Sequence, residues 1–479
     1  METSIFPGQS ISSAISALRP GDVLTLSPGQ YVEDVVVTGL IGTRSAPITI
    51  RGKPGAIVRA SGAVNVDAFL VRSGSCFIIF DGLEITGANR AGILCSGSSA
   101  HNITIRNCHI HDNAKWQIQS TGVNYMTVEN CKLHGSTDQH GIYFSSSSYC
   151  IASHNEIYSN KCNGIHLNGG YGYGEGGDGI VHGPTIVGNI IYNNGAGGGS
   201  AVNMDGVDDG LIANNLIVNN KAGGITNFKV DGLHCGQRNK IFNNTVYFPQ
   251  GDGRYSLQLG RGSTDNVVKN NLFVCGGTVL EVQDAALNGN TFDHNVYYRI
   301  NQWGAAPILY GGGGYTVSRW QSATGQDAAS SGAMPTFANI SQQNFRLATA
   351  SVGVDDGANL PEVAEDVAGT PRPQGAACDI GAYELAAAQI EPPTPPPVPP
   401  PAPAQQLWVT YDSRPGIMLA VSLWVGNQPR LRNDGLWVRG VAPCAQWGQT
   451  SAANAKLACA PAIDNLKPGE IVPVNLVVD

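Results

Sequence analysis

The chain has 479 residues, of which 13% are charged and 61 are glycine, and its formal net charge is −8. Few charges and abundant glycine are typical of short strands joined by tight turns, so we expect little helix. The acidic balance excludes a nucleic-acid partner, which would need a strongly basic face. No apolar run reaches the about 18 residues that a membrane-spanning helix requires.

The first predicted element is a short amphipathic helix within residues 5–18. Ile11, Ile15 and Leu18 fall on one helical face there. Three strands separated by Gly and Pro turns follow, with the sequences VLTLSPGQY, APITIRG and AIVRAS. We expect the helix to cover the open end of a stack of strands.

A motif then recurs through residues 105–298, in which a short apolar strand leads to an Asn or Cys and a second apolar residue. Copies include IRNCHIHDN (105–113), IANNLIVNN (212–220) and VKNNLFV (268–274). Such a period indicates stacked units that bury their apolar faces against their neighbours. We expect the recurring residue to stack inside a turn and bond the backbone, with the asparagines tolerating left-handed φ. The matching positions are Cys108, Cys131, Asn155, Asn189, Asn215, Asn244, Asn271 and Asn295.

A second strand follows the Asn-bearing one in each repeat, as in GIYFS (141–145) and GIHLN (164–168). Alternation along a strand points every second residue away from the core. Stacking therefore predicts a ladder of outward side chains about 4.8 Å apart. Its members are Gln119, Tyr143, His166, Asn203, Thr226, Gln258 and Glu281.

The opening segment and the repeat resemble secreted right-handed parallel β-helix proteins that act on polysaccharides. The resemblance implies an all-β, right-handed parallel β-helix of about ten coils with a capping helix at the N-terminal end. It also implies an extracellular or cell-surface location. Because METSIFPGQS lacks the basic start and apolar core of a signal peptide, we expect either a processed form or another export route.

The segment TDQHGIYF (137–144) is the first candidate site. Asp138, His140, Tyr143 and His166 would lie on neighbouring rungs of the ladder. Such a group can perform acid–base chemistry on a sugar, and it partly resembles the Asp-x-His motif of alginate epimerases of this fold. Alternatively, Trp116, Tyr143 and His166 would form a platform for sugar rings without catalysis, or the histidines would be ordinary surface residues. A Gly-rich insertion, YGYGEGGDGIVHG (171–183), follows and is either a binding loop or a solvated one.

The densest polar cluster lies in NMDGVDDG and NFKVDGLHCGQR, between residues 203 and 238. Asp205, Asp208 and Asp209 would supply the oxygen ligands that Ca²⁺ requires, and Asp205 should face outward. A calcium ion near Lys229 would favour its neutral form, which can remove a proton from a uronate. Arg254 and Arg261 would bind substrate carboxylates.

This cluster resembles the calcium-dependent pectate lyases of the β-helix fold, in which Asp residues hold Ca²⁺ and a Lys or Arg is the base. Alternatively, DGVDDG is only an acidic turn. NMDGVD (203–208) also resembles the N-x-D-G-x-D motif of polygalacturonase-type hydrolases, but the accompanying Gly-His-Gly and Arg-x-Lys motifs are missing.

Beyond Tyr298 the period fades. VAGTPRPQGAACDIGAYE (367–384) resembles the segment that closes many bacterial β-helix domains, so we expect it to be the far cap. We expect the helix domain to span 1–387, a Pro-rich linker to span 388–405, and a small β domain, with an immunoglobulin-like sandwich pattern, to span 406–479.

Of the 11 cysteines, Cys108 and Cys131 are expected to stack unpaired, and Cys444 and Cys459 are disulfide candidates. The absence of CxxC pairs argues against a zinc site.

The function predicted from these patterns is calcium-assisted β-elimination on a polysaccharide that contains uronic acid. The alternatives are a non-catalytic glycan-binding adhesin or phage spike, a polygalacturonase-like hydrolase and a uronate epimerase. The partner is thus a polysaccharide, an acidic one by this mechanism, and the oligomeric state stays open. We assign catalysis to Lys229, Arg254, His166 and Asp231, substrate binding to Tyr143, His140, Asn203, Arg261 and Trp116, and calcium binding to Asp205, Asp208 and Asp209.

Overall fold

The computed structural model describes residues 1–72, 74–170, 177–249, 253–300 and 306–386, and five strands between residues 407 and 478. The chain divides into two compact units, Met1–Gln389 and Ile390–Asp479. None of the helices among these residues is long and apolar enough to cross a membrane.

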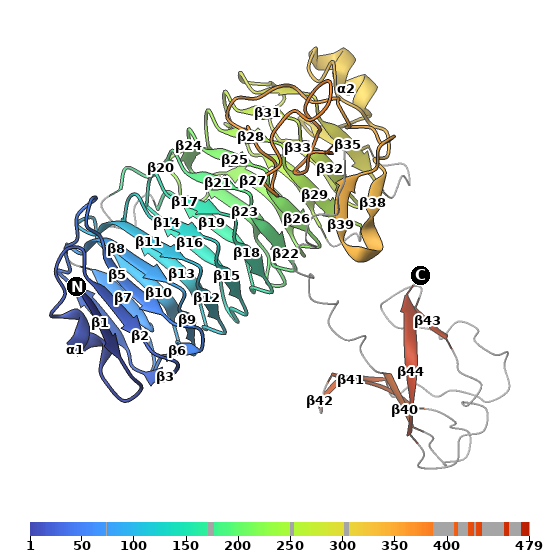
Figure 1. Ribbon diagram of the computed structural model, residues 1–479. Coiled ribbons are helices and arrows are strands. Elements are labelled where there is room, and N and C mark those ends of the chain that lie inside the picture. Colours follow the sequence, from blue (N-terminus) through green and yellow to red (C-terminus); the bar gives the residue numbers. More distant parts are fainter. Residues whose placement is uncertain are drawn as a thin grey trace. The chain divides into compact units, whose positions relative to one another are not determined.

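The first unit is a parallel β-helix, in which each full coil adds one strand to each of three sheets (Figure 1). Sheet 1 contains β1 (Glu2–Ile5), β2 (Val23–Leu26), β5 (Ile48–Gly52), β8 (Cys76–Asp81), β11 (His101–Arg106), β14 (Thr127–Glu129), β17 (Ile151–Ser153), β21 (Thr185–Val187), β25 (Leu211–Ala213), β28 (Lys240–Phe242), β31 (Val267–Lys269) and β34 (Thr291–Asp293). Sheet 2 contains β3 (Gly29–Val32), β6 (Ala56–Arg59), β9 (Glu84–Thr86), β12 (His109–His111), β15 (Lys132–His134), β18 (Glu156–Tyr158), β22 (Ile190–Tyr192), β26 (Leu216–Val218), β29 (Thr245–Phe248), β32 (Leu272–Cys275) and β35 (Val296–Arg299). Sheet 3 contains β4 (Val35–Thr38), β7 (Phe69–Arg72), β10 (Ala91–Ser96), β13 (Trp116–Thr121), β16 (Ile142–Ser145), β19 (Ile165–Asn168), β23 (Ser200–Asp205), β27 (Gly223–Phe228), β30 (Tyr255–Leu259), β33 (Thr278–Val282), β36 (Ile308–Tyr310) and β37 (Gly313–Tyr315).

The coils number about twelve rather than the predicted ten, because sheets 1 and 3 each contain 12 strands. Four strands of sheet 1 (β1, β2, β5 and β8) precede β11, where the first copy of the motif begins. Strand alternation sends one set of side chains inward, so that Ile142, Phe144 and Leu167 are fully buried. Stacked in register, these side chains form one continuous apolar core along the axis.

The predicted asparagine ladder is confirmed and lies in the turn between sheets 1 and 2. Asn189 donates its backbone N–H and its Nδ2 to Oδ1 of Asn215, at 3.1 and 3.0 Å, and Asn215 bonds Asn244 in the same way. The left-handed residue is not the ladder Asn but the one before it, such as His154 (φ 54°) and Asn214 (φ 53°). Each ladder amide thus satisfies buried backbone groups of neighbouring coils.

The nine described cysteines are free, as was predicted for Cys108 and Cys131. Both are buried at the first two ladder positions, and the backbone N–H of Cys131 donates to Oδ1 of Asn155. Cys444 and Cys459 lie outside the described residues.

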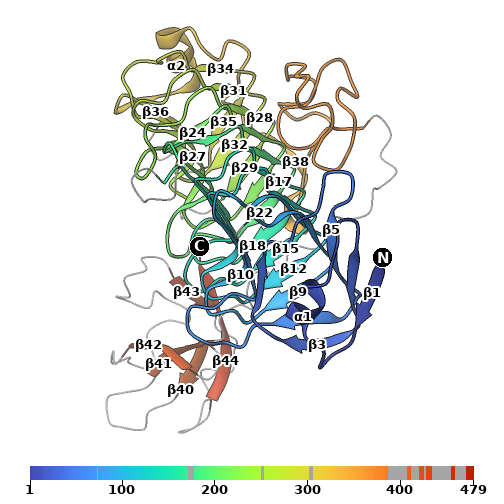
Figure 2. The same cartoon turned by 90° about the vertical axis from the view of Figure 1, so that its left-hand side faces the viewer.

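The N-terminal end is covered as predicted. The helix α1 (Ile11–Ile15) buries Ile11 and Ile15 against the first coils, and Ser10 caps it by accepting from the backbone N–H of Ser13 (Figure 2). The opposite end is covered by α2 (Val317–Thr324), whose Trp320 is fully buried in the core.

The prediction that residues 367–384 form the far cap is wrong. They lie along the side of the later coils, where Asn243 donates to the carbonyl of Asp379 and the N–H of Ala382 donates to Oγ1 of Thr245. A buried ion pair, Arg372 Nη1 to Glu384 Oε2 at 2.8 Å, holds this lateral segment together. The shorter elements of the unit are β20 (Val181–His182), β24 (Val207–Asp208), β38 (Phe337–Asn339), a 3₁₀ turn (Ile340–Gln342) and β39 (Asn344–Leu347).

In the second unit the described residues form a single antiparallel sheet of five strands in the order β42-β41-β40-β44-β43. The predicted linker falls outside the described residues, and the sandwich stays a prediction. The strands are β40 (Leu407–Thr410), β41 (Ala420–Val425), β42 (Gln428–Asn433), β43 (Ala455–Ala458) and β44 (Ile471–Val478).

Candidate active site on sheet 3

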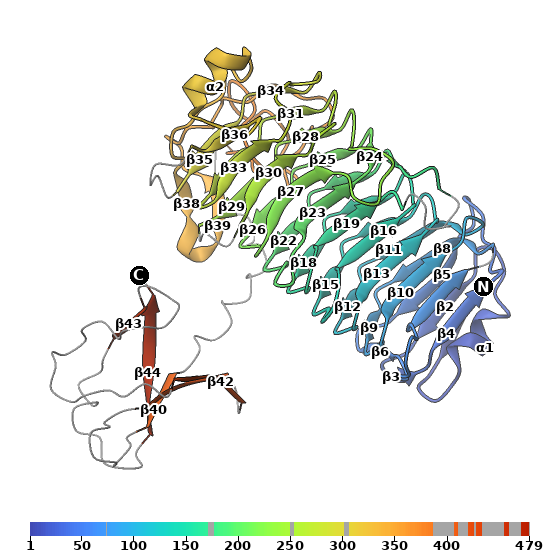
Figure 3. The same ribbon diagram turned by 180° about the vertical axis from the view of Figure 1, so that it is seen from behind.

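The predicted ladder of outward side chains exists on sheet 3, and we call it the outward row (Figure 3 shows this sheet). The strand register pairs Tyr143 with His166, His166 with Asn203, and Asn203 with Thr226. Gln119 continues the row on one side, and Gln258 and Glu281 on the other. Residues far apart in sequence therefore become neighbours about 4.8 Å apart.

At the centre of the row, hydrogen bonds fix the protonation of two histidines. The backbone N–H of Asn163 donates to Nδ1 of His140 at 3.2 Å. His140 must then carry its proton on Nε2, which faces Nδ1 of His166 at 3.2 Å. His166 in turn carries its proton on Nε2, a buried atom that makes no hydrogen bond to any residue the structure describes.

Both rings are neutral at neutral pH. Burial lowers the pKa of His166 to about 4, and the nearby carboxylate of Asp231 opposes this shift only in part. Burial also lowers the pKa of His140 well below its ordinary value, and the neighbouring His166 lowers it further. The site thus contains a neutral imidazole N–H that is free to donate.

Tyr143 and Asp231 lie beside this donor and are bridged by one amide. Nδ2 of Asn168, at the end of β19, donates to the Tyr143 hydroxyl at 3.1 Å and to Oδ2 of Asp231 at 3.0 Å. Neither Asn163 nor Asn168 was singled out from the sequence. Strand alternation could have identified Asn168 as a site residue, since it lies two residues after His166 on the same side of the strand.

The rings of Trp116, Tyr143 and His166 do not form the predicted platform. Trp116 and His166 stack on opposite sides of Tyr143, with ring centroids 6.1 and 4.9 Å away and ring planes within 22° in both pairs. The faces of Tyr143 are therefore covered by its neighbours, and its edge is what remains for a ligand. Hydrogen bonding to a sugar suits this arrangement better than stacking on a pyranose face.

The prediction that Asp205 faces solvent is wrong. Strand alternation does put it on the outer side of β23, but the segment after β27 folds over it, and Asp205 is only 1% exposed. Its carboxylate accepts the backbone N–H groups of Val230, Asp231 and Gly232 at 2.8 to 2.9 Å. It therefore fixes the loop that carries Asp231.

The other two predicted calcium ligands are held by Arg238. Its guanidinium donates to Asp208 at 3.0 Å and to both carboxylate oxygens of Asp209 at 2.8 and 2.9 Å. These hydrogen bonds with Arg238 lower the pKa of Asp209. The donor set does not fit a shared calcium ion, and among the described residues the side chains close enough to share a metal ion lie on sheet 2.

The predicted basic residues lie apart from one another. Lys229 is exposed just after β27, two strands away from His166 in the sheet. Arg254 and Arg261 flank opposite ends of β30 (Tyr255–Leu259), and their binding of substrate carboxylates stays a prediction. Arg254 reaches back toward the preceding coil, because its Nη2 lies 3.9 Å from where a Cβ on Gly198, shortly before β23, would be.

The Gly-rich insertion is only partly described. Tyr171, Tyr173 and Glu175 lie outside the described residues. Further along, Oδ2 of Asp178 contacts Nε2 of His182 at 2.8 Å, and β20 pairs with β24. The insertion thus adds a small extra ladder beyond the end of sheet 3.

Comparisons with known proteins agree on the fold. The family model described as right handed beta helix region matches residues 56–198. The chain is similar to a crystal structure of pectate lyase Pel9A, with 17% identity and a TM-score of 0.52 over 80% of this chain and 96% of that one. The first unit is therefore a right-handed parallel β-helix.

Weaker likenesses extend to proteins with different titles. An alginate lyase from Paenibacillus sp. str. FPU-7 has 18% identity and a TM-score of 0.42, over 66% of this chain and 99% of that one. PfbA, a surface adhesin of Streptococcus pneumoniae, has 14% identity and a TM-score of 0.42, over 60% and 86%. No curated protein sequence matches the chain.

Proposed function

We propose that this protein acts on a polysaccharide bound along the outward row of sheet 3, and that its reaction is β-elimination at a uronic acid unit. The observation that carries the proposal is the hydrogen-bond relay from Asn163 through His140 to His166. This relay leaves a buried N–H on His166 without a partner among the described residues. A buried polar atom in this state is costly unless a ligand uses it.

The chemistry follows from the protonation of the site. β-Elimination removes the proton at C5 of a uronate, places negative charge on its carboxylate, and then breaks the C4–O bond. A neutral N–H donor aimed at that carboxylate stabilises the developing charge. His166 is suited to this role because its other nitrogen already accepts from His140.

The proton from C5 needs an acceptor beside the donor. Asp231 is our candidate, because Asn168 holds its carboxylate next to the Tyr143 hydroxyl. Tyr143 would pass a proton to the departing oxygen, and Arg254, whose guanidinium reaches back toward β23, would bind a neighbouring uronate. A secreted or cell-surface location fits a substrate of this kind.

Calcium is not part of this proposal. Sequence reasoning predicted it from Asp205, Asp208 and Asp209, but their carboxylates accept from backbone N–H groups and from Arg238. Lys229 loses its predicted role as base together with the ion that was to lower its pKa.

The test is incubation with pectate and with alginate, each with and without a chelator. A lyase creates an unsaturated product that absorbs ultraviolet light, a hydrolase releases reducing ends without that absorbance, and an epimerase changes the uronate composition without cleavage. We expect the first result, with no effect of the chelator. Binding of either polymer without any product would overturn the reaction and leave a glycan-binding function.

Variants assign the roles. We expect His166→Ala and Asp231→Asn each to lower kcat by at least about 100-fold, the lower end of what a donor to a developing negative charge and a general base, respectively, contribute. Ile151→Ala is the control, because Ile151 is exposed on β17 of sheet 1, away from the outward row. Full activity in His166→Ala would remove His166 from the mechanism.

A further inference from the structure

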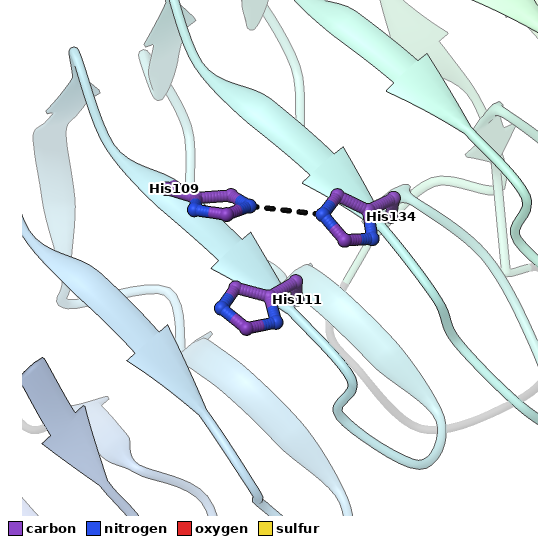
Figure 4. Close-up of side chains that lie close together, drawn as sticks. All are labelled: His109, His111 and His134. Atoms are coloured by element: carbon purple, nitrogen blue, oxygen red, sulfur yellow. Dashed lines mark hydrogen bonds between the residues drawn. The ribbon is translucent and has the colours of Figure 1, made fainter. Parts of the chain in front are cut away.

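Three histidines gather on sheet 2, away from the outward row (Figure 4). His109 and His111 alternate onto the same side of β12, and the register of β12 with β15 places His134 opposite His111. One ring nitrogen from each of the three lies within 4.8 Å of the others. Nε2 of His109 is 2.9 Å from Nε2 of His134.

Part of this arrangement is a stack of aromatic rings, but this stack does not include the contact between His109 and His134. His111, His134 and Tyr158 lie one above another, with ring centroids 5.2 and 4.5 Å apart. Nε2 of His109 and Nε2 of His134, which lie on successive coils, are by contrast joined by a hydrogen bond, so that the polar edges of two imidazoles face each other.

The surroundings of His111 are those of a metal ligand. Its Nδ1 lies 2.8 Å from Oδ2 of Asp112, which orients the ring and leaves Nε2 as the nitrogen that could bind a metal ion. Oε1 of Glu84, on the preceding coil, is 3.4 Å from that Nε2. Three imidazoles with a carboxylate beside them make up a ligand set that zinc accepts.

We propose that His109, His111 and His134 bind one divalent transition-metal ion, of the zinc, cobalt, nickel or copper class, with Glu84 next to the fourth position. Imidazole suits these ions, whereas calcium prefers oxygen ligands. At about 2.0–2.1 Å from a tetrahedral ion, ligand nitrogens are roughly 3.4 Å apart, so the His109–His134 contact needs to open only slightly. The ion would cross-link two successive coils.

Cysteine spacing in the sequence argued against zinc, and the histidines were overlooked. The signal was nevertheless present in the repeat. IRNCHIHDN and VENCKLHGS, aligned on Cys108 and Cys131, place His111 and His134 in the same slot, and the His-x-His spacing puts His109 on the same side of its strand.

The experiment is a titration of the full chain, prepared without a polyhistidine tag, with Co²⁺ by visible absorption and with Zn²⁺ by calorimetry. We expect one equivalent of each metal. Tetrahedral Co²⁺ should give d–d bands without the thiolate charge-transfer band that a site among the nine described cysteines would produce. Binding of less than one equivalent, or a thiolate spectrum, would overturn the proposal.

Variants test the ligand set. We expect His134→Ala to weaken binding by more than about 100-fold, since even outer-shell changes cost roughly 10–100-fold, and Asp112→Asn by roughly 10-fold. Asn tolerates the left-handed backbone of Asp112 (φ 52°), so this second variant remains informative if His134→Ala does not fold. His182→Ala, outside the cluster, should bind like the wild type, and equal affinity in all three variants would contradict the assignment.

Discussion

Nε2 of His140 donates to Nδ1 of His166 across 3.2 Å, from one coil to the next. The direction of this bond is set by a backbone N–H, that of Asn163, which cannot exchange donor for acceptor. The proton of His166 therefore stays on Nε2, on the side away from His140.

This relationship predicts how stability depends on pH. The pKa of His166 falls from 6.5 in an unfolded chain to about 4 in the folded protein, so the unfolded state binds more protons between these values. Stability due to the neutral ring is present above pH 6.5 and is lost as pH falls toward 4, by up to about 3 kcal/mol. We expect the difference in unfolding free energy between wild type and His166→Gln to shrink over this window, measured by urea titration at several pH values. Parallel curves for the two proteins would contradict the assignment.

The sequence repeat allowed the stacking of the coils and the outward row to be predicted, because both follow from a period that can be recognised in the sequence itself. Asp205 shows where such reasoning ends. Its place after Met204 correctly put it on the outer side of β23, but its three partners come from residues 230–232, and no local pattern reveals that this segment folds back. The sequence of residues 367–384 likewise indicated a closing segment, but it did not indicate whether that segment covers the end or the side of the β-helix.

His140 illustrates a third limit. It precedes β16, in the turn, so strand alternation says nothing about its direction. Its role depends on the distances to Asn163 and His166, which belong to the next coil. The candidate residues could thus be named from sequence, but their protonation states could not.

The asparagine ladder predicts a large cost for a single truncation. Asn215→Ala would leave the N–H and Nδ2 of Asn189 without their acceptor and the carbonyl of Ile186 without its donor. Each such buried group costs about 1–3 kcal/mol, so we expect a loss of roughly 3 kcal/mol or more in urea unfolding. The control is Asn219→Gly, an exposed position on the same coil whose left-handed φ of 52° suits glycine, and it should change stability by less than about 1 kcal/mol. Equal losses at both positions would mean that the ladder bonds contribute little.

The structural role of Asp205 can be separated from calcium binding. Asp205→Asn turns one acceptor oxygen into an NH₂ group that faces a backbone N–H, which should cost about 1–3 kcal/mol. Asp209→Asn, at an exposed carboxylate beside Arg238, should cost less than about 1 kcal/mol. A chelator should leave the Tm of the wild type unchanged. A Tm that falls with chelator in the wild type but not in Asp205→Asn would restore the calcium site.

The lateral segment depends on the ion pair between Arg372 and Glu384, whose side chains are each only 1% exposed. Glu384→Gln removes the negative charge and leaves the guanidinium buried without its counter-charge, although the carbonyls of Asp379 and Gly381 still accept from it. Breaking a buried pair in this way costs about 3–5 kcal/mol, whereas replacing both partners with apolar residues of similar volume is often nearly neutral. We therefore expect Glu384→Gln to expose residues 367–384 to limited proteolysis, and Arg372→Met with Glu384→Leu to resist cleavage better than the single variant. If the single variant resists protease as the wild type does, the carbonyl contacts alone suffice to hold the segment against the coils.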